Sequence, residues 1–291
     1  MPKRKKILEE KTAWLSETFC PQKGPINLEK IAEKFKIKLH YGDFNGDFEG
    51  LIVYSNGRFT IFFHRPDTQT INPARLRFSF AHEIGHYFIA THRQELIRTG
   101  SLQKNTTSEM SSDPYIEKEA DFFAANLLMP SPWLISDFAN KPFSTQLITQ
   151  TANFYEVSLL AALNRYATLG PDPIMIVNST AGQIPGKNPP NRSKLFPFHQ
   201  LKNSPSRSVP QNSLAAELNT QPHRSGFQSK QLIASDWFSS SNPAHLQQPL
   251  IETCYQHEGS KQITSILQPG LLSNNENNIE QLDSSNLILP W

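Results

Sequence analysis

Apolar residues recur at helical spacing in several stretches of the first 170 positions. The clearest row is Leu76, Phe80, Ile84 and Phe88, and Asn72-Pro73 ahead of it suits the cap and first turn of a helix. The same spacing, with cap and breaker residues, predicts further helices over residues 1–20, 27–35, 114–128, 131–140, 145–155 and 159–169.

Strand patterns lie between the predicted helix over residues 27–35 and the helix that contains Ile84. Residues 37–41 alternate, and the runs Leu51–Tyr54 and Arg58–Phe63 flank Asn56-Gly57, a pair typical of a two-residue hairpin turn. A small antiparallel sheet should therefore precede the helix around Ile84. With one more strand expected over residues 171–177, the fold class is α+β.

The pattern changes after residue 182. Seven prolines lie between Pro185 and Pro222 among polar residues, a composition typical of a linker or a disordered stretch. Weak apolar periodicity returns near residue 231. We therefore expect a compact domain over residues 1–182, a disordered linker over 183–230, and a C-terminal region over 231–291 that is either a small sensor-like module or disordered.

Charge and composition limit the partners and the cellular compartment that we expect for this protein. The 28 basic and 26 acidic residues nearly balance, which gives no global attraction to nucleic acid or membrane. Cys20 and Cys254 are the only cysteines, so a cysteine-rich zinc site is excluded and a reducing compartment is indicated. The chain lacks the run of roughly 18 apolar residues that a membrane span requires. The basic start lacks the apolar run of a secretory signal. We expect a cytoplasmic protein.

The predicted helix 72–88 contains His82-Glu83-Ile84-Gly85-His86, the HExxH pattern. Positions four apart share one helix face, so His82 and His86 can direct both imidazoles at one metal ion. Glu83 lies beside that face, where it suits a general base acting on water. Gly85 costs about 1 kcal/mol against alanine inside a helix, so another group should approach closely there. This pattern predicts a metallopeptidase.

A catalytic site of this kind needs a third protein ligand. On the predicted helix 114–128, Glu117 and Asp121 are four apart and share a face, whereas Glu119 points away from both. Glu117 is our candidate ligand, and Asp121 could accept the far ring N–H of a ligand histidine, His82 in our interpretation. The alternative is that these carboxylates only solvate a helix surface.

Two segments together resemble the ImmA/IrrE-type metallopeptidases. FSFAHEIGHYFI at residues 78–89 is similar to the family pattern [TS]xAHExGH, and YIEKEADFFAANLLMP at residues 115–130 is similar to ExxAxxFAxxLLMP. INLEKIAEKF and Gly50 before the hairpin also fit, whereas Ser79 stands where many relatives have threonine. The resemblance covers about residues 25–180.

The resemblance implies a glutamate-zincin-like fold, with zinc bound by His82, His86 and Glu117 and with Glu83 as the catalytic base. It also implies a regulatory endopeptidase that cuts helix-turn-helix repressors of the Xre type, often under stress. Longer relatives carry a GAF-like sensor module after the peptidase, in the place of residues 230–291. The polar segment Arg93–Asp113 is expected to be a loop that gates the cleft, and the sheet edge within Leu51–Phe63 to hold substrate as an added strand.

Two other functions compete with a peptidase. Residues 144–170 mimic a helix-turn-helix, but Arg165 is their only basic residue, whereas DNA affinity depends on several phosphate contacts. A structural helix pair is therefore favoured, and no direct nucleic-acid contact is expected. The second alternative is a regulator that retains the metal and binds a partner without proteolytic turnover. The sequence makes no prediction of oligomeric state.

Overall fold

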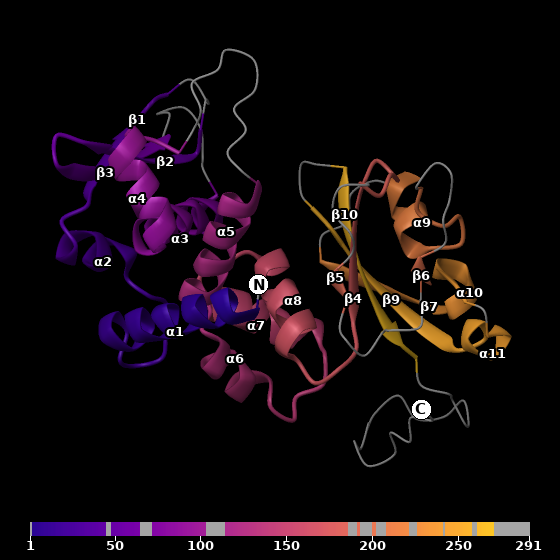
Figure 1. Ribbon diagram of the computed structural model, residues 1–291. Helices are drawn as coiled ribbons and strands as arrows, with labels where there is room; N and C mark the ends of the chain where they lie inside the picture. The colour runs from indigo at the N-terminus through magenta and orange to yellow at the C-terminus, as the bar shows by residue number, and fades with distance from the viewer. Residues whose placement is uncertain are drawn as a thin grey trace. The chain divides into compact units, whose positions relative to one another are not determined.

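The computed structural model describes residues 2–44, 48–64, 72–102, 114–185, 191–192, 200–201, 208–220, 226–240, 242–257 and 261–270. The chain forms two compact units, Met1–Asp172 and Pro173–Trp291 (Figure 1). Mixed helices and small sheets confirm the α+β class. No helix among the described residues is both long and apolar enough to cross a membrane.

Helices form most of the first unit, and all of them except α4 lie close to the predicted ranges. They are α1 (Pro2–Phe19), α2 (Leu28–Lys34), α3 (Pro73–Phe88), α4 (Ala90–Thr99), α5 (Pro114–Leu128), α6 (Ser131–Phe138), α7 (Thr145–Tyr155) and α8 (Leu159–Leu169). Side chains cap several of them as expected. Asn72 accepts the backbone N–H of Ala74 at the start of α3, and Asn27 accepts that of Lys30 at the start of α2.

The predicted hairpin joins β2 (Gly50–Ser55) to β3 (Arg58–His64). Asn56 and Gly57 both have positive φ, 50° and 75°, as this tight turn requires. The sheet is mixed, however, and not purely antiparallel, because β1 (Lys38–Gly42) pairs in parallel with β3. The resulting strand order, β1-β3-β2, makes β3 central and leaves β2 as an edge.

The close packing of α3 against α5 forms the centre of the first unit. Gly85 of α3 faces Phe123 of α5 so closely that a Cβ at position 85 would lie 3.1 Å from Cδ1 of that ring. The sequence predicted a close approach at Gly85, and the structure confirms it. Phe80 and Ile84 are buried on the same helix, as the apolar row predicted.

The predicted loop Arg93–Asp113 is wrong in its first part. Residues up to Thr99 continue α4, and the segment then reaches the sheet, where Ser101 forms an antiparallel bridge with Val53. His92 and Leu96 are buried one turn apart, so a narrow inward face stabilises a helix whose other positions are polar. The rest of the predicted loop, residues 103–113, lies outside the described residues.

The helix pair α7–α8 packs as structural helices. Arg165, the only basic residue of the pair, is buried. Its guanidinium donates to the carbonyl of Met129 at 2.8 Å and to Oγ of Ser131 at 2.9 Å. Burial lowers the pKa of this guanidinium to about 10. The side chain therefore joins α8 to the start of α6 and presents no cation to solvent.

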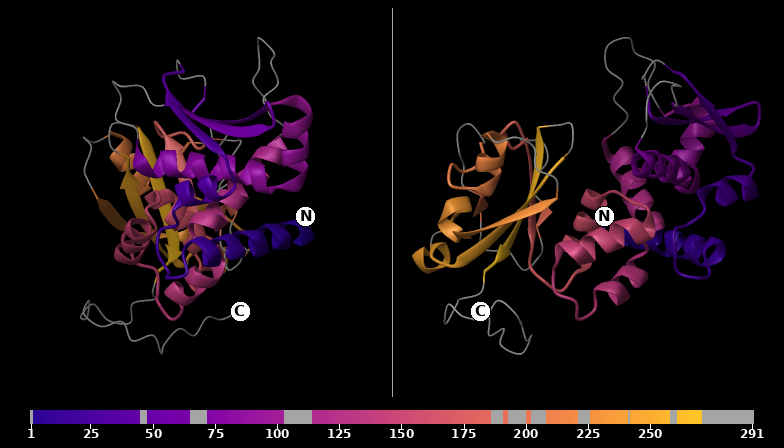
Figure 2. Two further views of the ribbon diagram at one scale, coloured as in Figure 1. Left: turned by 90° about the vertical axis from the view of Figure 1, so that its left-hand side faces the viewer. Right: turned by 180° about the vertical axis from the view of Figure 1, so that it is seen from behind.

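The second unit contains a five-stranded antiparallel sheet in the order β5-β4-β10-β9-β7, with helices on one face (Figure 2). Its elements are β4 (Met175–Thr180), β5 (Asn191–Arg192), β6 (Gln200–Leu201), α9 (Leu214–Thr220), β7 (Phe227–Ile233), α10 (Ala234–Trp237), β8 (Phe238–Ser239), α11 (Pro243–Leu246), β9 (Pro249–Gln256) and β10 (Gln262–Pro269).

This sheet changes the expected domain organisation. The strand predicted near residue 175 belongs to the second unit, because β4 pairs with β10, so the boundary falls at 172/173 and not at 182. The expected linker 183–230 contributes α9 and most of β7 to the same unit. Of the expected C-terminal region 231–291, residues up to 270 complete the sheet, and residues 271–291 lie outside the described residues.

A buried carboxylate connects the sheet of the second unit to its first helix. Glu252 of β9 is fully buried, and it accepts the backbone N–H groups of Leu214 at 2.7 Å and Ala215 at 3.2 Å. These N–H groups lie at the start of α9, so a strand residue caps the helix together with Ser213, whose Oγ accepts the Ala216 N–H at 3.1 Å. Ser265 also donates to this carboxylate at 3.0 Å, so the buried oxygens of Glu252 have hydrogen-bond partners.

We predict that a fragment ending at residue 172 folds as a monomer, whereas one ending at residue 182 associates. The longer fragment carries Met175, Ile176 and Val177, each 1% exposed in the full chain, on a strand without its partner. Light scattering and thermal denaturation of the two fragments measure the difference. A stable monomer at 182 together with an aggregating fragment at 172 would assign β4 to the first unit.

Candidate metal centre

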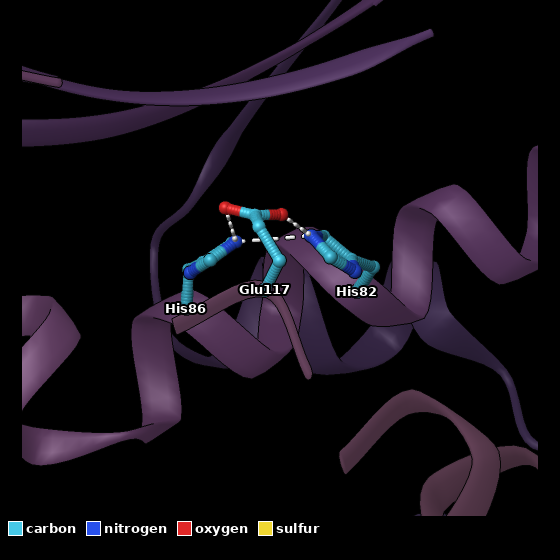
Figure 3. Close-up of side chains that lie close together, drawn as sticks. All are labelled: His82, His86 and Glu117. Atoms are coloured by element: carbon cyan, nitrogen blue, oxygen red, sulfur yellow. Dashed lines mark hydrogen bonds and ion pairs between the residues drawn. The ribbon is translucent and has the colours of Figure 1, made fainter. Parts of the chain in front are cut away.

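Helix α3 brings His82 and His86 together on one face. Their Nε2 atoms lie 3.0 Å apart, and the ring centroids are 4.7 Å apart. His86 is buried, and His82 is partly exposed. Both rings therefore direct the same nitrogen to a common point (Figure 3).

Helix α5 adds the carboxylate of Glu117 above these two rings (Figure 3). Its Oε2 lies 3.0 Å from Nε2 of His82, and its Oε1 lies 3.8 Å from Nε2 of His86. The three ligand atoms lie within 4.8 Å of one another. Ligands around one tetrahedral zinc ion are about 3.3 Å apart, as bond lengths near 2.0–2.1 Å require. Two imidazoles and one carboxylate in this arrangement fit a divalent ion with one position left open.

Asp121 lies one turn after Glu117 and contacts the far nitrogen of His82. Oδ1 of Asp121 is 2.9 Å from Nδ1 of His82. Burial disfavours the charged form of His82, but the carboxylates of Asp121 and Glu117 outweigh it and raise the pKa of His82 to about 10. The Asp121 carboxylate holds a proton on Nδ1, so an ion that binds this ring would replace only the proton on Nε2.

The far nitrogen of His86 has a partner that the sequence analysis missed. Nδ1 of His86 lies 3.1 Å from Nδ1 of His92, the buried histidine of α4. Glu119 points away from Glu117, as its spacing on the helix predicted. Its Oε2 lies 3.2 Å from Nε2 of His92. Burial lowers the pKa of His86, and the charge of His82 lowers it further. The only sequence signal was the four-residue spacing of His92 and Leu96, within a segment too polar to predict as a helix.

Glu83 is buried beside the two histidines and faces the sheet. Its Oε2 accepts the backbone N–H of Ile52 at 2.8 Å. Burial raises the pKa of Glu83 to about 7, although the charge of His82 and this hydrogen bond oppose the shift. A Cβ at Gly50 would lie 3.1 Å from Cγ of Glu83, so the carboxylate packs directly on the strand backbone. A carboxyl group with a pKa near neutrality suits proton transfer.

The edge of β2 next to Glu83 is only partly open. The carbonyl of Glu49 accepts the N–H of His64, so by alternation Gly50, Ile52 and Tyr54 direct their backbone groups away from β3. The Ile52 N–H donates to Glu83, and the Tyr54 N–H donates to the carbonyl of Gly100 at 2.8 Å. The expectation of a free edge is therefore wrong for the half that begins at Val53, which is bridged to Ser101.

Part of the first unit matches a known protein family. Residues 32–166 match the model of the Peptidase_M78 family, described as the IrrE N-terminal-like domain. No protein with curated annotation matches significantly.

Among solved structures, a Mycobacterium tuberculosis transcriptional regulator matches over 92% of this chain and 77% of its own, with a TM-score of 0.56. The identity is 9%, so this likeness concerns the fold alone. The family match spans all of the converging residues described above. Residues 32–166 therefore form an IrrE N-terminal-like domain of the Peptidase_M78 family.

Proposed function

We propose that this protein is a zinc-dependent endopeptidase in which His82, His86 and Glu117 hold the ion and Glu83 is the catalytic base. The observation that carries the proposal is the convergence of three ligand atoms beside a buried carboxylate. Zinc bound there would act as a Lewis acid that polarises a peptide carbonyl and acidifies water. Zinc is preferred because two imidazoles and one carboxylate form a typical catalytic donor set for this ion.

Glu83 handles the proton in this proposal. Its carboxylate takes a proton from the attacking water and gives it to the leaving amine, which a group with a pKa near neutrality can do in both directions. The Ile52 N–H and the backbone at Gly50 hold the carboxylate in one orientation. Asp121 keeps His82 in the tautomer that presents Nε2.

The proposed substrate is a helix-turn-helix repressor of the Xre type, as the family resemblance implies. An extended segment of the repressor would pair with the outward backbone groups of Gly50 and the outward carbonyl of Ile52, since the Ile52 N–H already donates to Glu83. The bridge between Val53 and Ser101 shortens that edge, which favours a selective peptidase over one that degrades bulk protein. The structural neighbour is a transcriptional regulator, which is consistent with a role in gene control. Cys20 and Cys254 are free thiols, which suits a cytoplasmic setting.

A regulator that binds metal and a partner without turnover is the competing function. Such a regulator would use the same residues as a peptidase, so only a measurement of peptide cleavage distinguishes the two functions. DNA binding through α7–α8 is disfavoured, because the one basic side chain of that pair is buried at Arg165.

We predict that the purified protein carries about one divalent ion per chain, because three protein ligands converge on one point. His86→Ala removes one of them, so the metal content should fall to a small fraction of that value. Elemental analysis of both proteins decides. Equal metal in the two would remove His86 from the site.

Glu83→Gln should keep the bound metal and the melting temperature while lowering kcat/KM by roughly a hundredfold or more, since it removes the base and preserves the shape. The assay uses a repressor captured by the inactive variant from cell extract, with casein as the unselective control. Cleavage by Glu83→Gln at a rate near wild type would exclude this residue as the base. Brisk degradation of casein by the wild type would leave a general peptidase.

Gly50→Ala should lower kcat about tenfold with the metal content unchanged. The new methyl group presses on Cγ of Glu83 and shifts the carboxylate by a few tenths of an ångström, and small misplacements are costly in catalysis. Ser55→Ala, at the exposed end of the same strand, is the matched control and should stay within twofold of wild type. Equal activity of the two variants would show that this contact does not orient Glu83.

A further inference from the structure

A chain of polar side chains extends from the far nitrogen of His86 to the surface. His92 is 1% exposed, and its Nδ1 lies 3.1 Å from Nδ1 of His86. The other nitrogen of His92, Nε2, lies 3.2 Å from Oε2 of Glu119 on α5. Arg4 of α1 pairs with the same carboxylate and also donates to Oγ1 of Thr91 at 2.7 Å. Helices α1, α4 and α5 thus meet behind one histidine of α3.

The positions of the ring protons of His86 and His92 follow from the hydrogen bond between the two rings. Two ring nitrogens 3.1 Å apart form a hydrogen bond only if a single proton lies between them. If His86 presents a free Nε2 to an ion, its ring proton is on Nδ1, and His86 is the donor to Nδ1 of His92. The proton of His92 is then on Nε2, where it donates to Glu119. The carboxylate of Glu119 accepts this hydrogen bond and also pairs with Arg4.

The partners of the two site histidines differ in burial. His82 contacts Asp121, whose side chain is 54% exposed, whereas His86 contacts a histidine that solvent barely reaches. Water can replace an exposed acceptor such as Asp121 but cannot easily replace His92. The orientation of the His86 ring therefore depends on the protein interior, and in particular on the acceptor at Nδ1 of His92.

We propose that His92 is a positioning residue of the metal centre. It accepts the Nδ1–H of His86 and so fixes both the tautomer and the ring angle that direct Nε2 of His86 to the ion. Glu119 and Arg4 in turn fix the tautomer of His92. The inference rests on the proposed metal site and adds to it a residue that lies outside the HExxH pattern.

The test compares His92→Asn with His92→Leu, two side chains with the same number of heavy atoms and the same branch at Cγ. The asparagine Oδ1 takes the place of the histidine Nδ1 as acceptor, whereas leucine has a similar shape and offers no acceptor. Zinc affinity is measured by competition with a chromophoric chelator, and the absorption spectrum of the cobalt(II)-loaded protein reports ligand geometry. We expect His92→Leu to weaken zinc binding by roughly 10–100-fold and to alter the cobalt spectrum, and His92→Asn to stay within about threefold of wild type.

Each other outcome has a distinct meaning. Wild-type affinity and spectrum in both variants would overturn the positioning role while leaving the proposed metal site intact. Equal weakening in both variants would assign His92 to packing alone and would also overturn it. A wild-type protein that binds no zinc would overturn the metal site, and the inference with it.

A second pair of variants decides the matter if His92→Leu does not fold. Glu119→Ala removes the acceptor of the His92 Nε2–H from a partly exposed position, so zinc affinity should fall several-fold. Glu95→Ala is the control. It also removes a glutamate paired with an arginine, Arg98 on α4, but Glu95 is not among the polar side chains that connect His86 to the surface. Equal zinc affinity in these two variants would overturn the proposal.

Discussion

The distance between α3 and α5 is the constraint on which the candidate site depends. Gly85 lets the ring of Phe123 approach the backbone of α3, and no larger residue would allow this separation without a shift. The same two helices carry His82 and His86 on one side of the seam and Glu117 and Asp121 on the other. Hydrogen bonds of 2.9 Å and 3.0 Å cross the seam only because the helices approach so closely. The packing of one glycine thus determines whether the polar groups meet.

Each polar group of the site is held from a different element. The sheet holds Glu83 through the Ile52 N–H, α5 holds His82 through Asp121, and α4 contacts His86 through His92. Buried polar groups are costly when unpaired, so these contacts also explain how an apolar helix face can contain three titratable side chains. Preorganisation of this kind suits catalysis, because little rearrangement is needed when substrate arrives.

Local patterns in the sequence predicted most of the first unit, because its helices have strong apolar periodicity and clear caps. The i, i+4 spacing also predicted which face of α5 would meet the two histidines. The contact between His92 and Glu119 could not be predicted in this way, since it depends on the extended backbone at Ile89 that separates α3 from α4. The sequence also did not predict the parallel pairing of β1 with β3 or the pairing of β4 with β10. Strand partners distant in sequence are not encoded in local periodicity.

The pairing of β4 with β10 has a consequence for how the protein is made. Every residue of the first unit has been synthesised once the ribosome passes position 172, whereas β4 waits for a partner that begins at residue 262. Domains generally fold as units, N-terminal first, at about 5–20 residues per second during synthesis. The candidate site can therefore assemble several seconds before the second sheet closes. During that interval the apolar strand β4 is exposed beside an already folded unit, and this is the stage at which a chaperone would be most useful.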